Sequence, residues 1–334
     1  TPGPICYGRG GTQPTISDAN YLLGRLRPSG LSLDEQLQRS KEVRRAFTEH
    51  LAPALKCSAV EAAEAVVQVA NTKMAGAIRM VSLSLGADPR DFALFAFGGA
   101  GPLHAAALAK ELDIPRVLIP ARPGLTNALG CVVADLRHDF VRTINTPLFD
   151  LPSGKLADIF GTLISKGKAL IAKETISLDS VDTILSLDMQ FVGQTHLLRV
   201  PVVDQQMSLD ALQALFEDAY LSRFQVALDD MPAAIVNVNC SILGRRPPLD
   251  LSLLSCPTSR AKTLGSAQTD TRNVFFGNTW LETPVCNRKA LPSDAAISGP
   301  AIIEQMDTTI VVPPEDHVTA DAVGNLILHV GGGA

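Results

Sequence analysis

Apolar residues in the first part of the chain recur at helical spacing and predict a pair of helices. Two serine–glutamate pairs with the spacing of a capping box open them, so helices are expected over about 32–51 and 58–86, with Gly86 ending the second. The apolar face of the second helix consists mainly of small side chains and includes Val81 and Leu85. Such a face indicates close packing in a core rather than a role in binding a partner helix.

A short apolar run, 92–97, passes through Gly98-Gly99-Ala100-Gly101-Pro102 into an alanine-rich segment. This pattern predicts a buried strand, a tight loop and the N-terminus of a helix. A second buried strand is expected at 116–119 and a second helix at 125–135. Strand, helix and strand at this spacing are typical of a βαβ unit with parallel strands.

The rest of the chain is expected to fold as further separate parts. A helix at 152–175, followed by strands and another helix, indicates an α+β unit over 146–245. Residues 246–271 are rich in Pro, Ser, Thr and Arg and lack periodicity, which is typical of a linker. Short strands broken by turns predict a small antiparallel β domain at 272–334, and residues 1–145 form the first domain.

The composition narrows the classes of function. The 334 residues carry a net charge of −5, so nucleic acid and anionic membranes are poor partners. No apolar run reaches the roughly 18 residues of a membrane-spanning helix, and nothing at the start resembles a signal peptide. The six cysteines lie far apart and the six histidines are isolated, without metal-ligand spacing. Scattered thiols fit a reducing compartment, so we expect a cytoplasmic protein.

The glycine loop, Gly98 to Gly101, is a candidate for ligand binding. Glycines let a ligand approach the main chain, and the unpaired N–H groups at a helix start attract anions. In open α/β sheets, ligands bind at this end of the strands. A packing turn without a ligand explains the same residues, so both interpretations stay open.

The opening loop, residues 8–20, combines glycines, hydroxyl groups, an arginine and a carboxylate. Such a mixture could cradle a phosphate or a polar substrate, with Asp18 holding a metal-bound water. The alternative is an ordinary turn in which Asp18 caps a helix over 19–26.

Other polar residues have ordinary structural interpretations. His104, at the start of the alanine-rich helix, is interpreted as a packing residue rather than a ligand contact. Glu304, Asp307 and Thr308 are interpreted as the residues of a hairpin turn. The sequence contains no nucleophile elbow and no Walker loop.

Several stretches together resemble the hydantoinase A/5-oxoprolinase family, and N-methylhydantoinase-type members in particular. The run Phe97-Gly98-Gly99-Ala100-Gly101-Pro102-Leu103-His104 is one of them. The others lie at residues 3–11, 14–15, 18–20, 23–25, 88–92, 128–130, 134–135, 192–194, 298–304 and 324–326. Each match is weak alone, but the set follows the family order along almost the whole chain.

The resemblance implies a fold and a reaction. It implies an α/β lobe of the actin and sugar-kinase (ribonuclease H-like) ATPase type. Members couple ATP hydrolysis to the opening of a cyclic amide such as 5-oxoproline or a hydantoin, and relatives are acetone carboxylase subunits. The implied route is phosphorylation of the amide oxygen, with Mg²⁺ neutralising the phosphates. A hydantoinase B-type subunit is the implied partner, and an oligomer is expected.

The resemblance also implies positions for the site. Gly98, Gly99, Ala100 and Gly101 match the loop that contacts the adenosine side of the nucleotide. Thr15, Asp18 and Asn20 match a loop near the cleft between the lobes. Within it, Asp18 is expected to face substrate or metal and to be catalytic.

Two departures from the family pattern limit which properties of the family can be expected of this chain. Family members are about twice as long, and their N-terminal phosphate-binding loops do not occur here. We therefore expect the C-terminal half of such an enzyme, inactive without an N-terminal half as its partner. In addition, Tyr220 stands where members commonly have histidine, and Phe224-Gln225 replaces a common Tyr-Gly pair.

Two other functions remain open from the sequence. The chain could be a non-catalytic interaction subunit that assembles through its β domain and the 58–86 helix. It could also be a sugar-kinase-like or acyl-kinase-like lobe, because such a lobe shares the fold but uses a hydroxyl or carboxylate acceptor.

Overall fold

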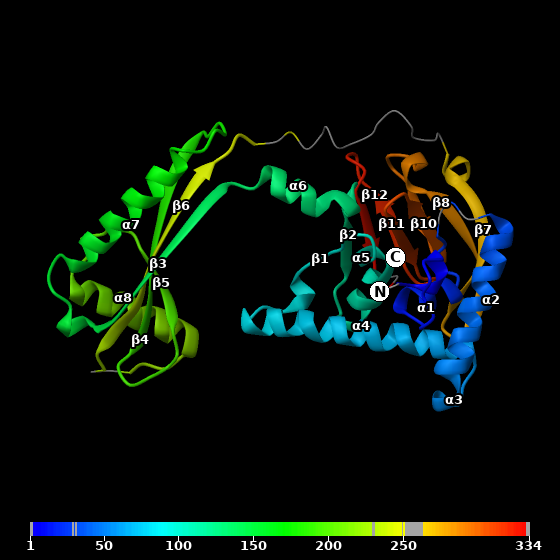
Figure 1. Cartoon of the computed structure of the whole chain (residues 1–334), viewed down its shortest axis with the longest axis horizontal. Coiled ribbons are helices and arrows are strands. Elements are labelled where there is room, and N and C mark those ends of the chain that lie inside the picture. Colours follow the sequence, from blue (N-terminus) through cyan, green and yellow to red (C-terminus); the bar gives the residue numbers. More distant parts are fainter. Residues whose placement is uncertain are drawn as a thin grey trace. The chain divides into compact units, whose positions relative to one another are not determined.

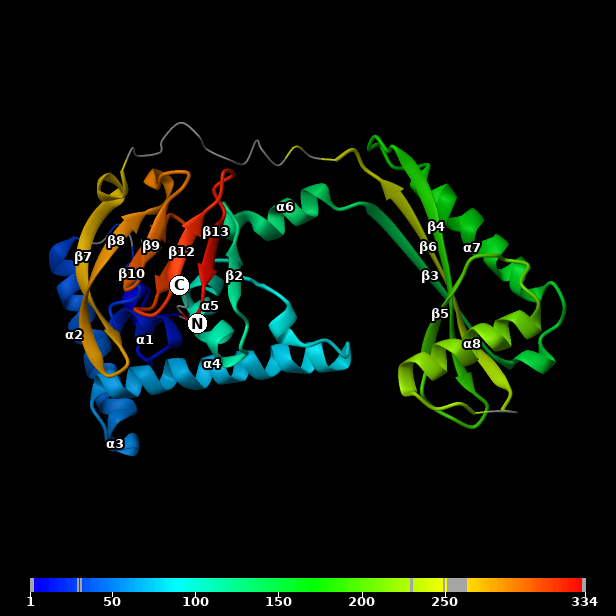
Figure 2. The same cartoon turned by 180° about the vertical axis from the view of Figure 1, so that it is seen from behind.

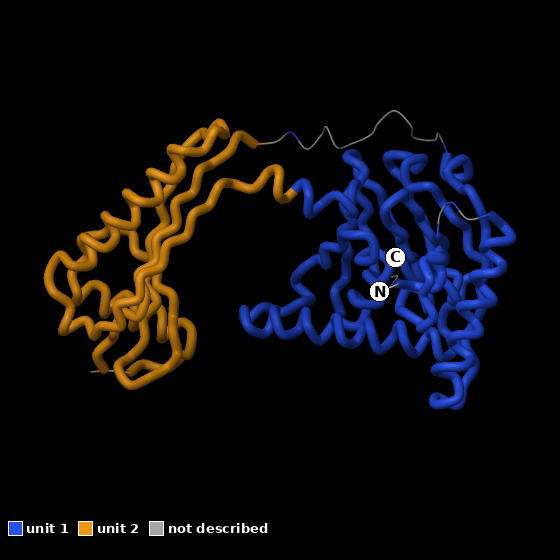
Figure 3. The backbone as a smooth tube through the Cα atoms, viewed as in Figure 1, with its two compact units in different colours: residues 1–129, 250–334 blue, residues 130–249 orange. Residues whose placement is uncertain are grey.

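The computed structural model describes residues 3–28, 30, 32–228, 231–248, 250 and 263–331. The chain forms two compact units of mixed α/β content (Figure 3). Unit 1 comprises residues 1–129 and 250–334, and unit 2 comprises residues 130–249. Leu249 and residues 251–262 of the predicted linker lie outside the described residues.

Unit 1 begins with the helices α1 (Ile16–Leu22), α2 (Leu33–His50), α3 (Ala52–Leu55) and α4 (Ala59–Ser84). The two predicted capping boxes are present at the starts of α2 and α4. Both helices pack with α1 around Phe47, and α4 buries small side chains such as Ala63 and Ala75. Val81 and Leu85 were expected in the same core but are exposed, because buried positions in this helix end at Ala75.

A five-stranded sheet holds the predicted βαβ unit (Figure 1). Its order is β1 (Leu94–Phe95), β2 (Arg116–Ile119), β13 (Leu326–His329), β12 (His317–Ala320) and β9 (Ala296–Ser298). The strands β1 and β2 are parallel and joined by α5 (Gly101–Glu111), which confirms the predicted strand–helix–strand arrangement. The prediction that the run 92–97 is a buried strand was wrong, because β1 has only two residues and lies at the edge of the sheet, where Phe95 is exposed. The remaining pairings in this sheet are antiparallel. The helix α6 (Thr126–Val133) follows β2.

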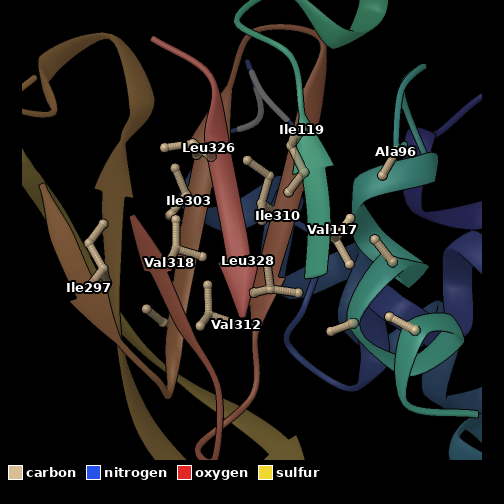
Figure 4. Close-up of a cluster of buried hydrophobic side chains, with 14 of the residues drawn as sticks. Ala96, Val117, Ile119, Ile297, Ile303, Ile310, Val312, Val318, Leu326 and Leu328 are labelled. Carbon is tan, nitrogen blue, oxygen red and sulfur yellow. The ribbon is translucent and has the colours of Figure 1, made fainter. Parts of the chain in front are cut away.

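The second sheet of unit 1 has the order β11 (Thr308–Val312), β10 (Ala301–Gln305), β8 (Thr279–Asn287) and β7 (Gln268–Phe276). One core lies between it, the five-stranded sheet and α5. Figure 4 shows Val117 and Ile119 of β2 with Leu326 and Leu328 of β13 in this core.

These pairings divide the chain differently from the predicted four parts. The strands expected to form a separate domain at 272–334 are instead shared between the two sheets of unit 1. The physical reason is the pairing of β13 with β2, which places residues 326–329 in one hydrogen-bonded sheet and one core with residues 116–119.

Unit 2 is a four-stranded antiparallel sheet with two helices (Figure 2). The strand order is β3 (Leu136–Pro147), β6 (Ala233–Arg245), β4 (Ser180–Phe191) and β5 (Leu198–Val202). The helices α7 (Lys155–Ile171) and α8 (Leu209–Phe224) share its core with Leu187 and Phe191. The strand β3 starts at residue 136, so part of the predicted first domain belongs to this unit.

Tyr220, which departs from the family pattern, has a packing role in unit 2. Its ring meets Phe191 edge-on, with 4.9 Å between the ring centroids. Its hydroxyl donates to Gln194 Oε1 at 3.2 Å.

None of the described helices combines the length and apolar content needed to cross a bilayer.

The shared core predicts that a truncation in β13 destabilises the whole of unit 1. Leu328→Ala should lower the free energy of unfolding by about 2–5 kcal/mol, because it leaves a cavity beneath β2. Leu83→Ala, at an exposed position of α4, should change it by less than about 0.5 kcal/mol. Denaturant titration measures both. A small effect for Leu328→Ala would mean that β13 does not support the sheet.

Candidate functional site

The glycine loop lies at the carboxyl end of the parallel strands β1 and β2. Ala96 N donates to Leu118 O at 2.9 Å, and Gly98 N donates to Pro123 O at 2.8 Å. Gly98 has a φ of +80°, which favours glycine, and a side chain there would meet no neighbour within 4 Å. Gly99 and Ala100 are exposed. The loop is therefore tied to β2 on one side and open on the other.

The main chain of this loop has unused hydrogen-bonding capacity. Among the described hydrogen bonds, none uses the N–H of Gly99, Ala100 or Gly101. Pro102, the second residue of α5, has no N–H to donate. The first amides of a helix lack intrahelical acceptors, and the helix dipole adds partial positive charge there. These N–H groups can donate hydrogen bonds to an anion or to a polar acceptor atom of a ligand.

The turn between β10 and β11 supports the loop from the far end of the sequence. Thr308 Oγ1 donates to Gly99 O at 3.1 Å and approaches Gly98 O at 3.4 Å. The carboxylate of Asp307 occupies the space beside Gly124, where a Cβ would collide with it. The sequence interpretation of Asp307 and Thr308 as turn residues missed this contact. No local signal could have shown it, because about two hundred residues separate the partners.

Arg288 fixes the end of β2 that carries the loop. This side chain is 7% exposed, and its Nη2 donates to Pro120 O at 2.6 Å and Ile119 O at 3.0 Å. Burial lowers the pKa of the guanidinium to about 10, while the nearby Asp307 carboxylate acts in the opposite direction. Its Nη1 and Asp307 Oδ1 are buried without a hydrogen-bond partner within the described part of the chain. The sequence analysis gave Arg288 no role.

Asp18 is placed inside unit 1 rather than in an open cleft. Its side chain is 0% exposed, and its oxygens accept from Cys6 N at 2.8 Å, Thr15 Oγ1 at 2.7 Å, Thr15 N at 3.0 Å and Ile5 N at 3.2 Å. Thr15 is the N-cap of α1 and Asp18 its third residue, so the two form a capping box. Asp18 is therefore not the N-cap that the alternative interpretation assumed. The catalytic role of Asp18 stays a prediction, and this geometry favours a structural role.

The other residues of the opening loop share this environment. Burial, with a further contribution from Asp18, raises the pKa of the Cys6 thiol. Asn20 is almost fully buried and its Nδ2 donates to Ile16 O at 3.0 Å. Its Oδ1 has no hydrogen-bond partner among the described atoms.

The two predicted site segments belong to different cores of unit 1. The helix that carries Asp18 packs with α2 and α4, whereas α5 packs in the core of the five-stranded sheet. No described hydrogen bond joins residues 15–20 to residues 98–101. Among the described residues, the structure therefore shows no hydrogen bond that would join the two segments into one site.

The described residues form no cluster that would hold a metal ion by protein ligands alone. None of them forms a group of three or more His, Cys, Asp or Glu side chains close enough to hold a metal ion. The Asp18 oxygens, which were expected to face a metal, are already occupied by four donors. Carboxylate ligands of Mg²⁺ need free oxygen atoms.

The position of Asp18 predicts a loss of stability when it is removed. Asp18→Ala should lower the free energy of unfolding by about 1–3 kcal/mol, because it leaves buried N–H groups without an acceptor. Asp34→Ala, at an exposed position in the first turn of α2, should cost less than about 1 kcal/mol. Thermal or denaturant unfolding measures both. Wild-type stability in Asp18→Ala, with loss of turnover in the assembled enzyme, would favour the catalytic role instead.

Comparison with known proteins places the chain among relatives about twice its length. The family described as Hydantoinase/oxoprolinase matches residues 1–140, and the Hydantoinase/oxoprolinase C-terminal domain matches residues 152–330. Caprolactamase subunit alpha of Pseudomonas jessenii is 31% identical, over 96% of this chain and 47% of that protein. Acetophenone carboxylase gamma subunit of Aromatoleum aromaticum is 30% identical, over 98% of this chain and 46% of that protein.

A solved structure agrees with the sequence comparison. The ATP-dependent caprolactamase from Pseudomonas jessenii superposes with a TM-score of 0.77 and 29% identity, covering 99% of this chain and 49% of that one. The chain therefore spans about half the length of these two relatives. The predicted resemblance is confirmed: the chain belongs to the hydantoinase/oxoprolinase family.

Proposed function

We propose that this chain forms one lobe of an ATP-dependent hydrolase that opens a cyclic amide, such as a lactam or a hydantoin. The observation that carries the proposal is the row of unpaired main-chain amides at Gly99, Ala100 and Gly101, held at the carboxyl end of β1 and β2. Membership of the family and the likeness to a protein described as an ATP-dependent caprolactamase support it.

In this proposal the glycine loop contacts the adenosine part of ATP, within a lobe of the actin and sugar-kinase type. The Asp307 carboxylate beside Gly124 disfavours a phosphate close to it and suits the hydroxyl and amine groups of a nucleoside. Arg288 and Thr308 act as positioning residues, because they hold the carboxyl end of β2 and the carbonyls of the loop.

The phosphates of ATP and their Mg²⁺ are proposed to bind a complementary N-terminal half. The proposed route is phosphorylation of the amide oxygen, which makes the amide carbon electrophilic toward water. Phosphoryl transfer depends on positioning and on neutralising charge, so one side of such a cleft contributes little by itself. A hydantoinase B-type subunit and a higher oligomer complete the proposed assembly, and the names of the relatives as subunits support this.

The first prediction concerns nucleotide binding. ATP should slow amide hydrogen exchange within residues 97–104. Ala100→Tyr should weaken ATP binding at least about ten-fold by covering the free amides. Ala172→Tyr, at an exposed position at the end of α7, is the matched control and should bind like the wild type. ATP binding without protection of 97–104 would contradict the assignment of the loop.

The second prediction concerns turnover. The chain alone should show no lactam- or hydantoin-dependent ATP hydrolysis, and adding its N-terminal half should restore the activity. Phosphate release with and without each cyclic amide measures this. Full turnover by the isolated chain would overturn the proposed division of labour between two halves.

A non-catalytic interaction module is the second candidate function, and one observation favours it. The last turns of α4 and the region of β1 leave large apolar side chains exposed, including Met80, Leu83 and Phe92. A groove with a volume of about 490 Å³ and mostly apolar walls lies among these elements. Exposed apolar patches of this kind often mark protein interfaces. Tight binding of a partner without ATP motifs, unaffected by nucleotide, would favour this function.

A further inference from the structure

A second cavity lies inside unit 1, and its lining residues do not include the glycine loop, residues 98–101. Its volume is about 360 Å³, which suits a small molecule. Its walls come from α4, α5, the segment after α1, the β7–β8 turn and the segment after β11. The polar side chains that matter are Arg25, Glu64, Asn71 and His104.

Arg25 brings a buried positive charge that forms no ion pair among the described residues. Its Nη2 donates to Phe275 O at 3.1 Å, and the guanidinium lies 5.7 Å from the centroid of the Phe276 ring. Its Nε is buried and has no hydrogen-bond partner in the described part of the chain. Burial lowers the pKa of this guanidinium, whereas Glu64 acts in the opposite direction. A buried guanidinium with one N–H group left without an acceptor, and with no ion pair, favours an acidic ligand here.

Glu64 brings a negative charge to the same cavity. No ion pair or hydrogen bond of its side chain is found among the described residues, and none joins it to Arg25. Of the other charged residues that line the cavity, Lys110 and Glu315 form an ion pair, with 2.7 Å between Nζ and Oε2. Asp316 Oδ1 accepts from the main-chain N–H of Gly331 at 2.9 Å, so its charge has no described ion-pair partner either. The cavity therefore combines the positive charge of Arg25 with the negative charges of Glu64 and Asp316, and Glu64 is the carboxylate whose field acts on Arg25.

His104 and Asn71 add a neutral polar pair. Each side chain is 7% exposed, and His104 Nδ1 lies 2.8 Å from Asn71 Oδ1. Burial and the neighbouring Arg25 lower the pKa of His104, so the neutral ring predominates at neutral pH. A neutral imidazole and an amide that share one hydrogen bond leave two donor hydrogens and two acceptor lone pairs unused, whichever way the amide is oriented. Such a pair suits a polar ligand without adding net charge.

We infer that this cavity binds a small zwitterion, an amino acid whose carboxylate meets Arg25 and whose ammonium group meets Glu64. The apolar side chains of Val67 and Leu103, which also line the cavity, would cover its carbon chain. The inference does not rest on the proposed function, because both charges and the cavity belong to this chain. Hydrolysis of a lactam yields a molecule of this class, whereas hydrolysis of a hydantoin yields a carbamoyl amino acid, which lacks the ammonium group.

The test compares zwitterions with molecules that carry only one of the two charges. Calorimetry on the full chain would measure binding of γ-aminobutyrate, δ-aminovalerate and ε-aminocaproate, with hexanoate and hexylamine as the singly charged probes. At least one zwitterion should bind about ten-fold more tightly than either singly charged probe. Equal binding of hexanoate, or no binding of any zwitterion at millimolar concentration, would overturn the inference.

Two variants and a matched control identify the residues. Arg25→Gln should weaken binding of the preferred zwitterion at least about ten-fold. Glu64→Gln should weaken it to the level of hexanoate, and it keeps the test decisive if Arg25→Gln fails to fold. Arg90→Gln, at an exposed surface ion pair, should bind like the wild type. Unchanged binding in a folded Glu64→Gln variant would show that the ammonium group is not recognised there.

Discussion

The pairing of β13 with β2 is the contact on which unit 1 depends. Four residue pairs, from Leu326–Ile119 to His329–Arg116, join a strand near the end of the chain to the second strand of the βαβ unit. Without this neighbour, β1 and β2 would form a short parallel pair with an open edge, which is a weak structure by itself. With it, Val117, Ile119, Leu326 and Leu328 close one core with α5. The glycine loop is rigid at its base because β2 is held in this way.

Buried polar side chains hold the loops of unit 1 in place through hydrogen bonds to the main chain. Arg288 donates to two carbonyls at the end of β2, and Thr308 donates to the carbonyl of Gly99. Asp18 holds the opening loop in the same way, because its carboxylate accepts hydrogen bonds from the main-chain N–H groups of Ile5, Cys6 and Thr15. In each place a side chain satisfies main-chain groups in a loop or at the end of a strand. The open amides of the glycine loop differ from this pattern, which is why they suit a ligand.

The relation between the two candidate regions bears on function. The glycine loop faces outward with free donors, whereas the opening loop is closed around Asp18. A ligand at the glycine loop would be held by main-chain groups on one side only, so a complementary surface must supply the rest of the contacts. The exposed apolar side chains at the end of α4 and near β1 provide area for such a surface within the same unit. Nucleotide binding and subunit assembly are therefore compatible roles.

The sequence by itself determined the local elements and the family. Capping boxes at α2 and α4 and the βαβ unit around Gly98–Gly101 were predicted correctly, because helix starts, periodicity and glycine turns depend on neighbouring residues. Only the tertiary structure decided that β13 joins β2, that Arg288 and Thr308 support the loop, and that Asp18 is enclosed. It also decided that Val81 and Leu85 are exposed, since periodicity shows an apolar face but not where its partner ends. Contacts between distant segments depend on how the whole core packs, and a local sequence pattern carries no information about that packing.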